Sequence, residues 1–274
     1  MSNPVLSKSS IEKALGRSSS QAGWGAPQSL EDQTFKSSSA YSGLTNPKAD
    51  HMTREGTTSA AILLTALLSV AAIFGWYNVQ ESFSGAVIFP TWVLGAVLLG
   101  FVTGMIMRFK PKASPILAPI YAVVQGVVLG SISRVFNAEY DGIVVQAVGI
   151  SIGVFIAMLT LYRTKIIQVT NKMRSTIMGA TMGIMLFYTV AIVASFFGVS
   201  FSIFTSSSLL SIGFSLLVAG LAASNLLLDF DTIERGQREG YPKYMEWYCA
   251  FGVLATMVWL YLEVLRLLAK LRSR

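Results

Sequence analysis

The chain has 274 residues, of which 53% are hydrophobic and only 13% are charged, and its formal net charge is +7. Soluble domains carry about 25% charged residues, so this composition indicates a polytopic membrane protein and argues against a soluble fold. We interpret the positive charge as loop lysines and arginines that set orientation in a bilayer, not as a nucleic-acid-binding surface. The single Cys249 excludes a disulfide within the chain, and with the single His51 it argues against a zinc or iron site built from nitrogen and sulfur ligands.

The N-terminal part, residues 1–55, is polar and contains several serine-rich patches interspersed with Gly and Pro. Such a composition cannot bury enough apolar surface to fold, which predicts a disordered cytoplasmic tail. No apolar run follows Met1, so we do not expect a secretory signal peptide. Residues 56–274 are predicted to form the membrane domain.

Seven apolar segments follow the tail, and each has about the 20 residues that an α-helix needs to cross the hydrocarbon core. The segments are 58–77, 86–107, 115–136, 142–162, 176–197, 207–230 and 247–269. Ten-residue alternating segments typical of a membrane barrel are absent from the sequence. We therefore predict an all-α membrane protein, a seven-transmembrane helix bundle.

Two loops rich in lysine and arginine set the predicted orientation. They follow the second and fourth segments and contain Arg108, Lys110, Lys112, Arg163, Lys165, Lys172 and Arg174. Both lie on the same side as the N-terminus, which predicts a cytoplasmic N-terminus. Seven spans then place the C-terminus outside. The basic residues near the C-terminus oppose that placement and leave open a seventh segment that does not cross fully.

Three acids stand at unusual places: Asp229 and Asp231 at the end of the sixth segment, and Glu263 inside the seventh. A carboxylate in hydrocarbon is costly unless it is paired, protonated or facing water. Two residues turn a helix by about 200°, so Asp229 and Asp231 point to opposite sides. The loop with Arg108 lies on the same side of the membrane as Asp229, so the two are expected to be able to pair.

Two readings of these acids stay open. In the first, Asp229 and Asp231 are solvated at a helix end, and Glu263 forms a local ion pair with Arg266 one turn on. In the second, the acids form a buried cluster, and protonation changes its contact with a cation or with Arg108.

Three amides in the spans, Gln125, Gln146 and Asn225, are candidates to line a water path. Helix-to-helix hydrogen bonding is the simpler role for each of them. Enzyme readings meet specific obstacles, because the sequence has no His in an apolar segment, no His-Glu-x-x-His and no Gly-x-Gly-Asp turn. We therefore expect a protein without catalytic residues and without a cofactor.

Three motifs resemble those of the Bax inhibitor-1 family. The run Leu228-Asp-Phe-Asp-Thr-Ile233 resembles the family's acid motif in the sixth segment, and Leu260-Tyr-Leu-Glu263 resembles Leu-Tyr-Leu-Asp in the seventh. Met107-Arg108 resembles the end of the second segment, which supplies an arginine latch. The resemblance covers residues 52–274. Glu263 stands where the family has Asp, which lengthens the side chain but keeps its chemistry.

The resemblance implies a bundle with its seventh helix in the centre and a pH-sensitive calcium leak. Asp229 and Glu263 would be the first and second acids of the pH sensor and would bind Ca²⁺ weakly. Arg108 would be the latch that competes for Asp229, and Asp231 an additional acid.

Our expectation is thus a calcium leak channel in a bacterial inner membrane, gated by protonation of a buried acid pair, with the lipid bilayer, Ca²⁺ and protons as its partners. Two alternatives stay open: a proton-coupled secondary transporter, and a regulatory interaction protein that modulates a membrane protease or stress pathway. The oligomeric state also stays open.

Contact between the two acids of the sensor is a separate question. Sixteen residues separate Trp247 from Glu263, which is about 24 Å of helix. The acids can meet only if the sixth helix continues past Asp231, or if residues 241–247 lie along the membrane interface.

Overall fold

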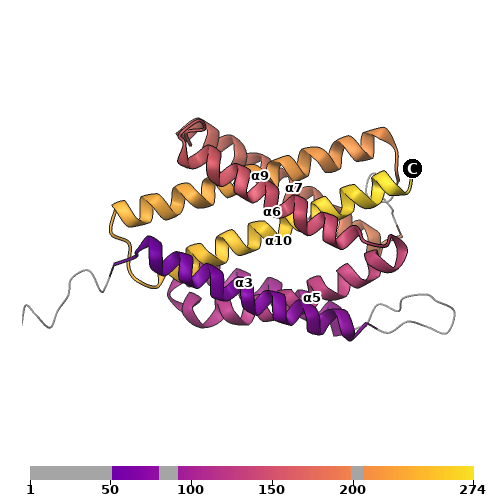
Figure 1. Cartoon of the computed structure of the whole chain (residues 1–274), viewed down its shortest axis with the longest axis horizontal. Helices are drawn as coiled ribbons and strands as arrows, with labels where there is room; N and C mark the ends of the chain where they lie inside the picture. The colour runs from indigo at the N-terminus through magenta and orange to yellow at the C-terminus, as the bar shows by residue number, and fades with distance from the viewer. Residues whose placement is uncertain (1–50, 80–91, 199–205) are drawn as a thin grey trace, which may run out of the picture. The chain divides into compact units, whose positions relative to one another are not determined.

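The computed structural model describes residues 51–79, 92–198 and 206–274. Seven helices in this part are long and apolar enough to cross a membrane (Figure 1). In chain order they are α3 (Arg54–Tyr77), α4 (Trp92–Phe109), α5 (Ser114–Glu139), α6 (Ile143–Arg163), α7 (Asn171–Phe196), α9 (Leu209–Arg238) and α10 (Met245–Arg272), with a 3-10 turn, η2 (Pro111–Ala113), before α5. The only β pairing among the described residues is an isolated bridge between His51 and Pro242.

The predicted all-α, seven-span fold is confirmed, and the largest difference in helix bounds lies in the sixth span. We predicted its end at residue 230, whereas α9 continues to Arg238 and has 30 residues. It is therefore about 45 Å long, against about 30 Å of hydrocarbon. Arg235 lies 3.4 Å from Asp231 one turn earlier, and such i,i+4 pairs support a helix end that carries charges.

Most of the predicted tail, residues 1–50, lies outside the described residues. Residues 51–55, which we assigned to the tail, instead form the start of the membrane domain. Thr53 caps α3 by accepting a hydrogen bond from Gly56 N at 3.0 Å. Met52 N also donates to Tyr241 O at 2.6 Å. These bonds attach the beginning of α3 to the connection between α9 and α10.

The closest helix packing joins α3 to α5. A Cβ at Gly126 would collide with Leu68 O, and one at Gly130 would collide with Ala72 O. Small residues four apart let helix backbones approach closely in lipid, where there is little hydrophobic drive for association. The two glycines of α5 are therefore required by the contact itself.

The last helix, α10, packs against α9, α3, α6 and α5, and Figure 1 shows it running between α3 and α6. Two clusters of buried side chains meet on it, one shared with α5, α6 and α9 and the other with α3, α4 and α5. The central place in the bundle expected for this helix stays a prediction.

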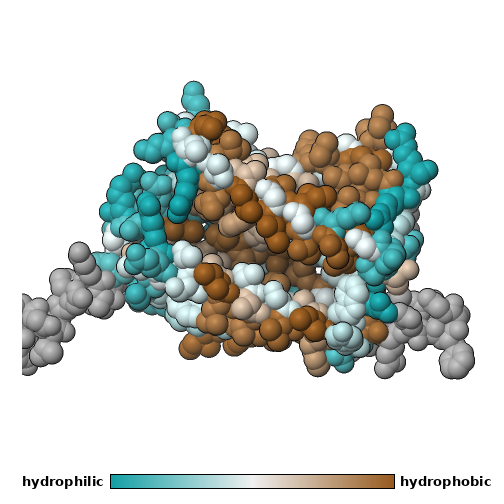
Figure 2. Space-filling view, viewed as in Figure 1, coloured by the Kyte–Doolittle hydropathy of each residue, from teal (hydrophilic) through white to brown (hydrophobic). Residues whose placement is uncertain are grey.

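The bundle has two ends with different contacts. We call the end where α3 begins and α9 ends the basic end; Arg54, Arg163, Arg174, Arg235 and Arg238 lie there. At the opposite end, Arg272 binds Asp141 O at 2.6 Å, and the chain terminates. Figure 2 shows hydrophilic residues at both ends with hydrophobic residues between them. The seventh helix thus runs the full length of the bundle.

Candidate functional site

Asp229 lies on α9 and faces α10. Its carboxylate is hydrogen-bonded to the Thr256 side chain. A Cβ added at Gly252 would lie 3.5 Å from Asp229 Oδ1. The other oxygen, Oδ2, is buried and has no hydrogen-bond partner among the described residues. Because Gly252 has no side chain, α10 leaves room at this level for the carboxylate. Asp229 is therefore a half-buried acid with one buried oxygen, and it has no charged partner in the described part of the chain.

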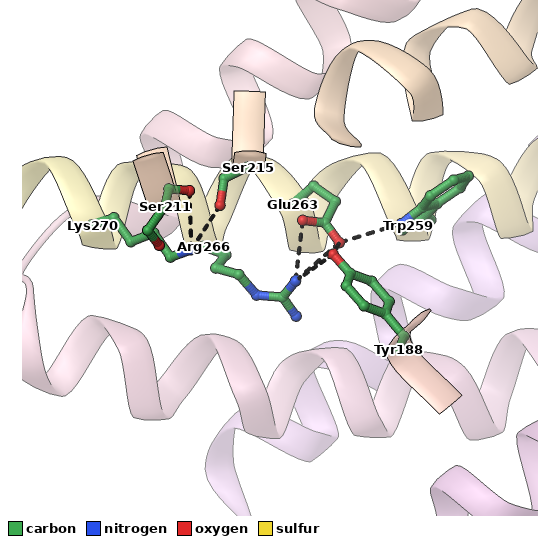
Figure 3. A network of polar contacts seen from close by, with 7 residues as sticks. All are labelled: Tyr188, Ser211, Ser215, Trp259, Glu263, Arg266 and Lys270. Atoms are coloured by element: carbon green, nitrogen blue, oxygen red, sulfur yellow. Dashed lines mark hydrogen bonds and ion pairs between the residues drawn. The ribbon is translucent and has the colours of Figure 1, made fainter. Parts of the chain in front are cut away.

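Glu263 differs from Asp229 in its partners: it is only 1% exposed, and hydrogen-bond donors surround its carboxylate (Figure 3). Arg266 Nη1 lies 3.1 Å from both carboxylate oxygens. Tyr188 of α7 donates to Oε1 at 2.9 Å, and Trp259 Nε1 donates to the same atom at 3.3 Å. This arrangement matches the local ion pair of the first reading. A buried carboxylate is tolerated when it is paired and hydrogen-bonded in this way.

The polar network continues from Glu263 toward the opposite end of the bundle. Arg266 also donates to the Tyr188 hydroxyl at 3.0 Å and lies over its ring, 5.5 Å from the centroid. One turn further, the buried Lys270 donates to Ser215 Oγ at 2.9 Å and to Ser211 O at 3.4 Å. Figure 3 shows Glu263, Arg266 and Lys270 following one another along α10.

The structure does not bring Asp229 and Glu263 together. Asp229 is level with Gly252 and Thr256 of the antiparallel α10, and Glu263 comes seven residues after Thr256, which is about 10 Å along the helix. The extension of α9 past Asp231, which we named as one condition for contact, is present. It is not sufficient, because the register between the two helices places Gly252 opposite the first acid.

Asp231 points away from Asp229, as the helical turn predicted, and it is bound by cations. Arg174 at the start of α7 forms an ion pair with its Oδ2, and Arg235 approaches the same oxygen at 3.4 Å. The side chain of Asp231 is 18% exposed. It therefore joins α7 to α9 at the basic end.

Arg108, the predicted latch, is the penultimate residue of α4, and it is exposed. Within the part of the chain that the structure describes, it forms no ion pair with Asp229. Its role as a latch stays a prediction, one that needs a different arrangement of α4 and α9 from the one seen here.

The three amides proposed for a water path lie in separate places. Asn225 of α9 donates to Thr181 Oγ1 of α7 at 2.8 Å, a helix-to-helix bond. Gln125 of α5 faces Gly100 of α4. Gln146 is exposed at the opposite end and accepts from Arg272 at 3.0 Å. The structure therefore does not bring them together around one path.

Sequence reasoning missed Tyr188, Thr256 and Arg174 as partners of the acids. Their hydroxyl and guanidinium groups carry no positional signal until the helices are packed. Lys270 was detectable, because Glu263, Arg266 and Lys270 follow the i, i+3, i+7 spacing of one helix face. No group of three or more His, Cys, Asp or Glu side chains within residues 51–79, 92–198 and 206–274 is arranged to hold a metal ion.

Comparison with known proteins adds one match. The family model described as Bax inhibitor 1 like matches residues 3–273, almost the whole chain. No curated protein and no solved structure gives a significant match. The seven apolar spans agree with a multi-pass membrane protein of this kind. The chain therefore belongs to the Bax inhibitor-1-like family.

Proposed function

We propose that the protein is a pH-sensitive calcium leak of a bacterial inner membrane, with its N-terminus in the cytoplasm. The observation that carries the proposal is the buried Oδ2 of Asp229, which has no hydrogen-bond partner among the described residues. A carboxylate held in this way is costly in an apolar surrounding. Either a proton or a cation relieves that cost, so the site responds to both.

The position of Asp229 supports a role near one mouth of a path. Twenty residues of α9, Leu209–Leu228, precede it, and they are enough to cross the hydrocarbon core. Asp229 thus stands at the depth where the basic end begins. Oxygen ligands suit Ca²⁺, and one carboxylate with a hydroxyl neighbour binds it weakly. Weak binding is what a permeation path requires, since the ion must leave as readily as it enters.

Glu263 would form the second element, about 10 Å further along α10. Its negative charge is held by Arg266, with Tyr188 and Trp259 as neutral donors. Protonation of Glu263 would remove the charge that attracts Arg266 and loosen the contact between α10 and α7. In this proposal the two acids act at successive depths instead of as a touching pair, and Asp231 holds α7 against α9.

The test is calcium flux from liposomes that contain the full chain and a calcium dye, measured across pH. Asp229→Asn removes the ionisable group with little change of shape, and Asp141→Asn is the matched control at an exposed acid of the opposite end. We expect D229N to change the flux and flatten its pH dependence, while D141N behaves as the wild type. Unchanged flux in both D229N and Glu263→Gln would overturn the proposal.

The same liposomes test two further points. Arg108→Gln should raise the flux at neutral pH if Arg108 is a latch, and an unchanged flux would remove that role. An imposed pH gradient distinguishes a leak from a proton-coupled transporter. A leak only dissipates a calcium gradient, whereas calcium accumulation driven by protons would identify a transporter.

A further inference from the structure

A long groove runs between α3 and α6. It has a volume of about 1960 Å³ and extends from Arg54 at the basic end to Tyr77 at the opposite end. Between these two walls it is lined by residues of α10, together with residues of α5 and α9, since α3 packs on α5 while α6 packs on α9 and α10. Figure 2 shows the molecule hollowed along this line. Sites for drug-sized molecules measure about 300–1,000 Å³, so the groove suits a larger and longer ligand.

The middle of the groove is apolar. Side chains from three helices line it, among them Ile62, Leu68, Ile152, Phe155, Leu254 and Met257. Hydroxyl groups in the α3 wall already donate to their own helix: Thr65 donates to Ala61 O at 2.8 Å, and Ser69 donates to Thr65 O at 2.8 Å. The wall therefore offers contact to hydrocarbon and few free donors.

All charged residues of the groove lie at its basic end. Five cations and two carboxylates, Asp231 and Glu234, line that end, which leaves a net charge of +3. Arg235 is 3.4 Å from Asp231, and Arg54 is 3.9 Å from Glu234. The other three cations, Arg163, Lys165 and Arg238, are exposed, and none of them forms an ion pair with any described residue.

Lys165 is placed there by an unusual backbone. Its φ of 56° lies in the left-handed region, where a helix end usually has glycine or asparagine. The turn after α6 thus carries a lysine at a position where the backbone conformation favours the uncharged residues glycine and asparagine.

We propose that the groove binds one anionic phospholipid, with the phosphate at Arg163, Lys165 and Arg238 and an acyl chain along α3 and α6. Charge complementarity supports this assignment: one end offers three cations that form no ion pair with a described residue, and the rest offers an apolar channel of membrane length. Basic residues near a membrane surface attract anionic lipid by about 1 kcal/mol each, or about fivefold in affinity. Lysines and arginines that merely orient the protein would show no such preference for one site.

The first experiment measures lipid binding to the full chain by native mass spectrometry, with phosphatidylglycerol and phosphatidylcholine of identical chains. We expect tighter binding of phosphatidylglycerol. The triple variant R163Q/K165Q/R238Q should lose that preference, by up to about fivefold per cation. The control K110Q/K112Q/K172Q removes the same charge from exposed lysines of the same end that do not line the groove, and it should keep the preference.

Three results would overturn the proposal: equal affinity of the wild type for the two lipids, equal loss in the two triple variants, or displacement of the lipid by glycerol phosphate at the same concentration. The first would mean binding of hydrocarbon alone, the second an effect of total charge, and the third a site for free phosphate.

A second experiment locates the acyl chain with a phosphatidylglycerol that carries a photoreactive group on that chain. Ala66→Trp would fill the groove from the α3 wall, whereas Leu63→Trp adds the same ring to an α3 residue that does not line it. Cross-links to α3 and α6 should fall in A66W and persist in L63W. Equal cross-linking in the two variants would place the chain elsewhere and overturn the proposal.

Discussion

Replacing Arg266 with methionine should destabilise the fold, because it leaves Glu263 buried without its cation. Breaking a buried ion pair by removing one partner typically costs about 3–5 kcal/mol. Here 35% of the Arg266 side chain is exposed, and Tyr188 and Trp259 still donate to the carboxylate. Both features reduce the loss, so we expect about 2–3 kcal/mol.

The free energy of unfolding is measured by titrating the full chain with SDS in mixed micelles, and the circular dichroism signal of the helices monitors unfolding. Arg274→Met provides the control, since Arg274 is an exposed residue beyond the end of α10. The double variant E263Q/R266M should recover about 1–3 kcal/mol relative to R266M, because the glutamine keeps an oxygen for Tyr188 and Trp259 without a buried charge. Equal stability of R266M and R274M would refute the reasoning, and so would a double variant no more stable than R266M.

Three further substitutions test other contacts in the same titration. Gly56→Ala should lose about 1–3 kcal/mol, because its methyl group would collide with the Glu246 carboxylate, and the same substitution should cost less in a Glu246→Ala background. Tyr188→Phe should lose about 1–2 kcal/mol by removing a donor to a buried carboxylate; stability equal to the wild type would show that the bond contributes nothing. Arg174→Gln should lose less than about 1 kcal/mol, since the pair with Asp231 is partly exposed, and a loss that does not shrink in high salt would contradict an electrostatic origin.

The number, length and order of the spans were predictable because hydropathy and the thickness of a bilayer determine them together. The end of the sixth helix was not. Residues 231–238 carry four charged side chains, which in a hydropathy profile resemble a loop. The ion pairs of Asp231 with Arg174 and Arg235 allow the helix to continue beyond the hydrocarbon.

The individual acids of the candidate site were predicted from the sequence, but the contacts that they make with other helices were not. Spacing along one helix identified the pair of Glu263 with Arg266, since i,i+3 neighbours must lie close. Contacts between helices depend on register, which the apolar pattern leaves undetermined. Gly252 lies opposite Asp229 because α9 and α10 interlock in one particular way, and this register separates the two acids. Tyr188 is a partner for the same reason.

The attachment of the start of α3 to the start of α10 has a consequence for biogenesis. Thr53 N and Thr53 Oγ1 donate to Glu246 at 2.9 and 2.8 Å, across a separation of 193 residues in sequence. Helices enter the membrane in chain order, so the hydrogen bonds between the first span and the last can form only after the last span has been inserted. Contacts of such long range form late in folding. A chain that stops before Glu246 would hold six spans and still have an open bundle, whose first helix a quality-control protease could reach.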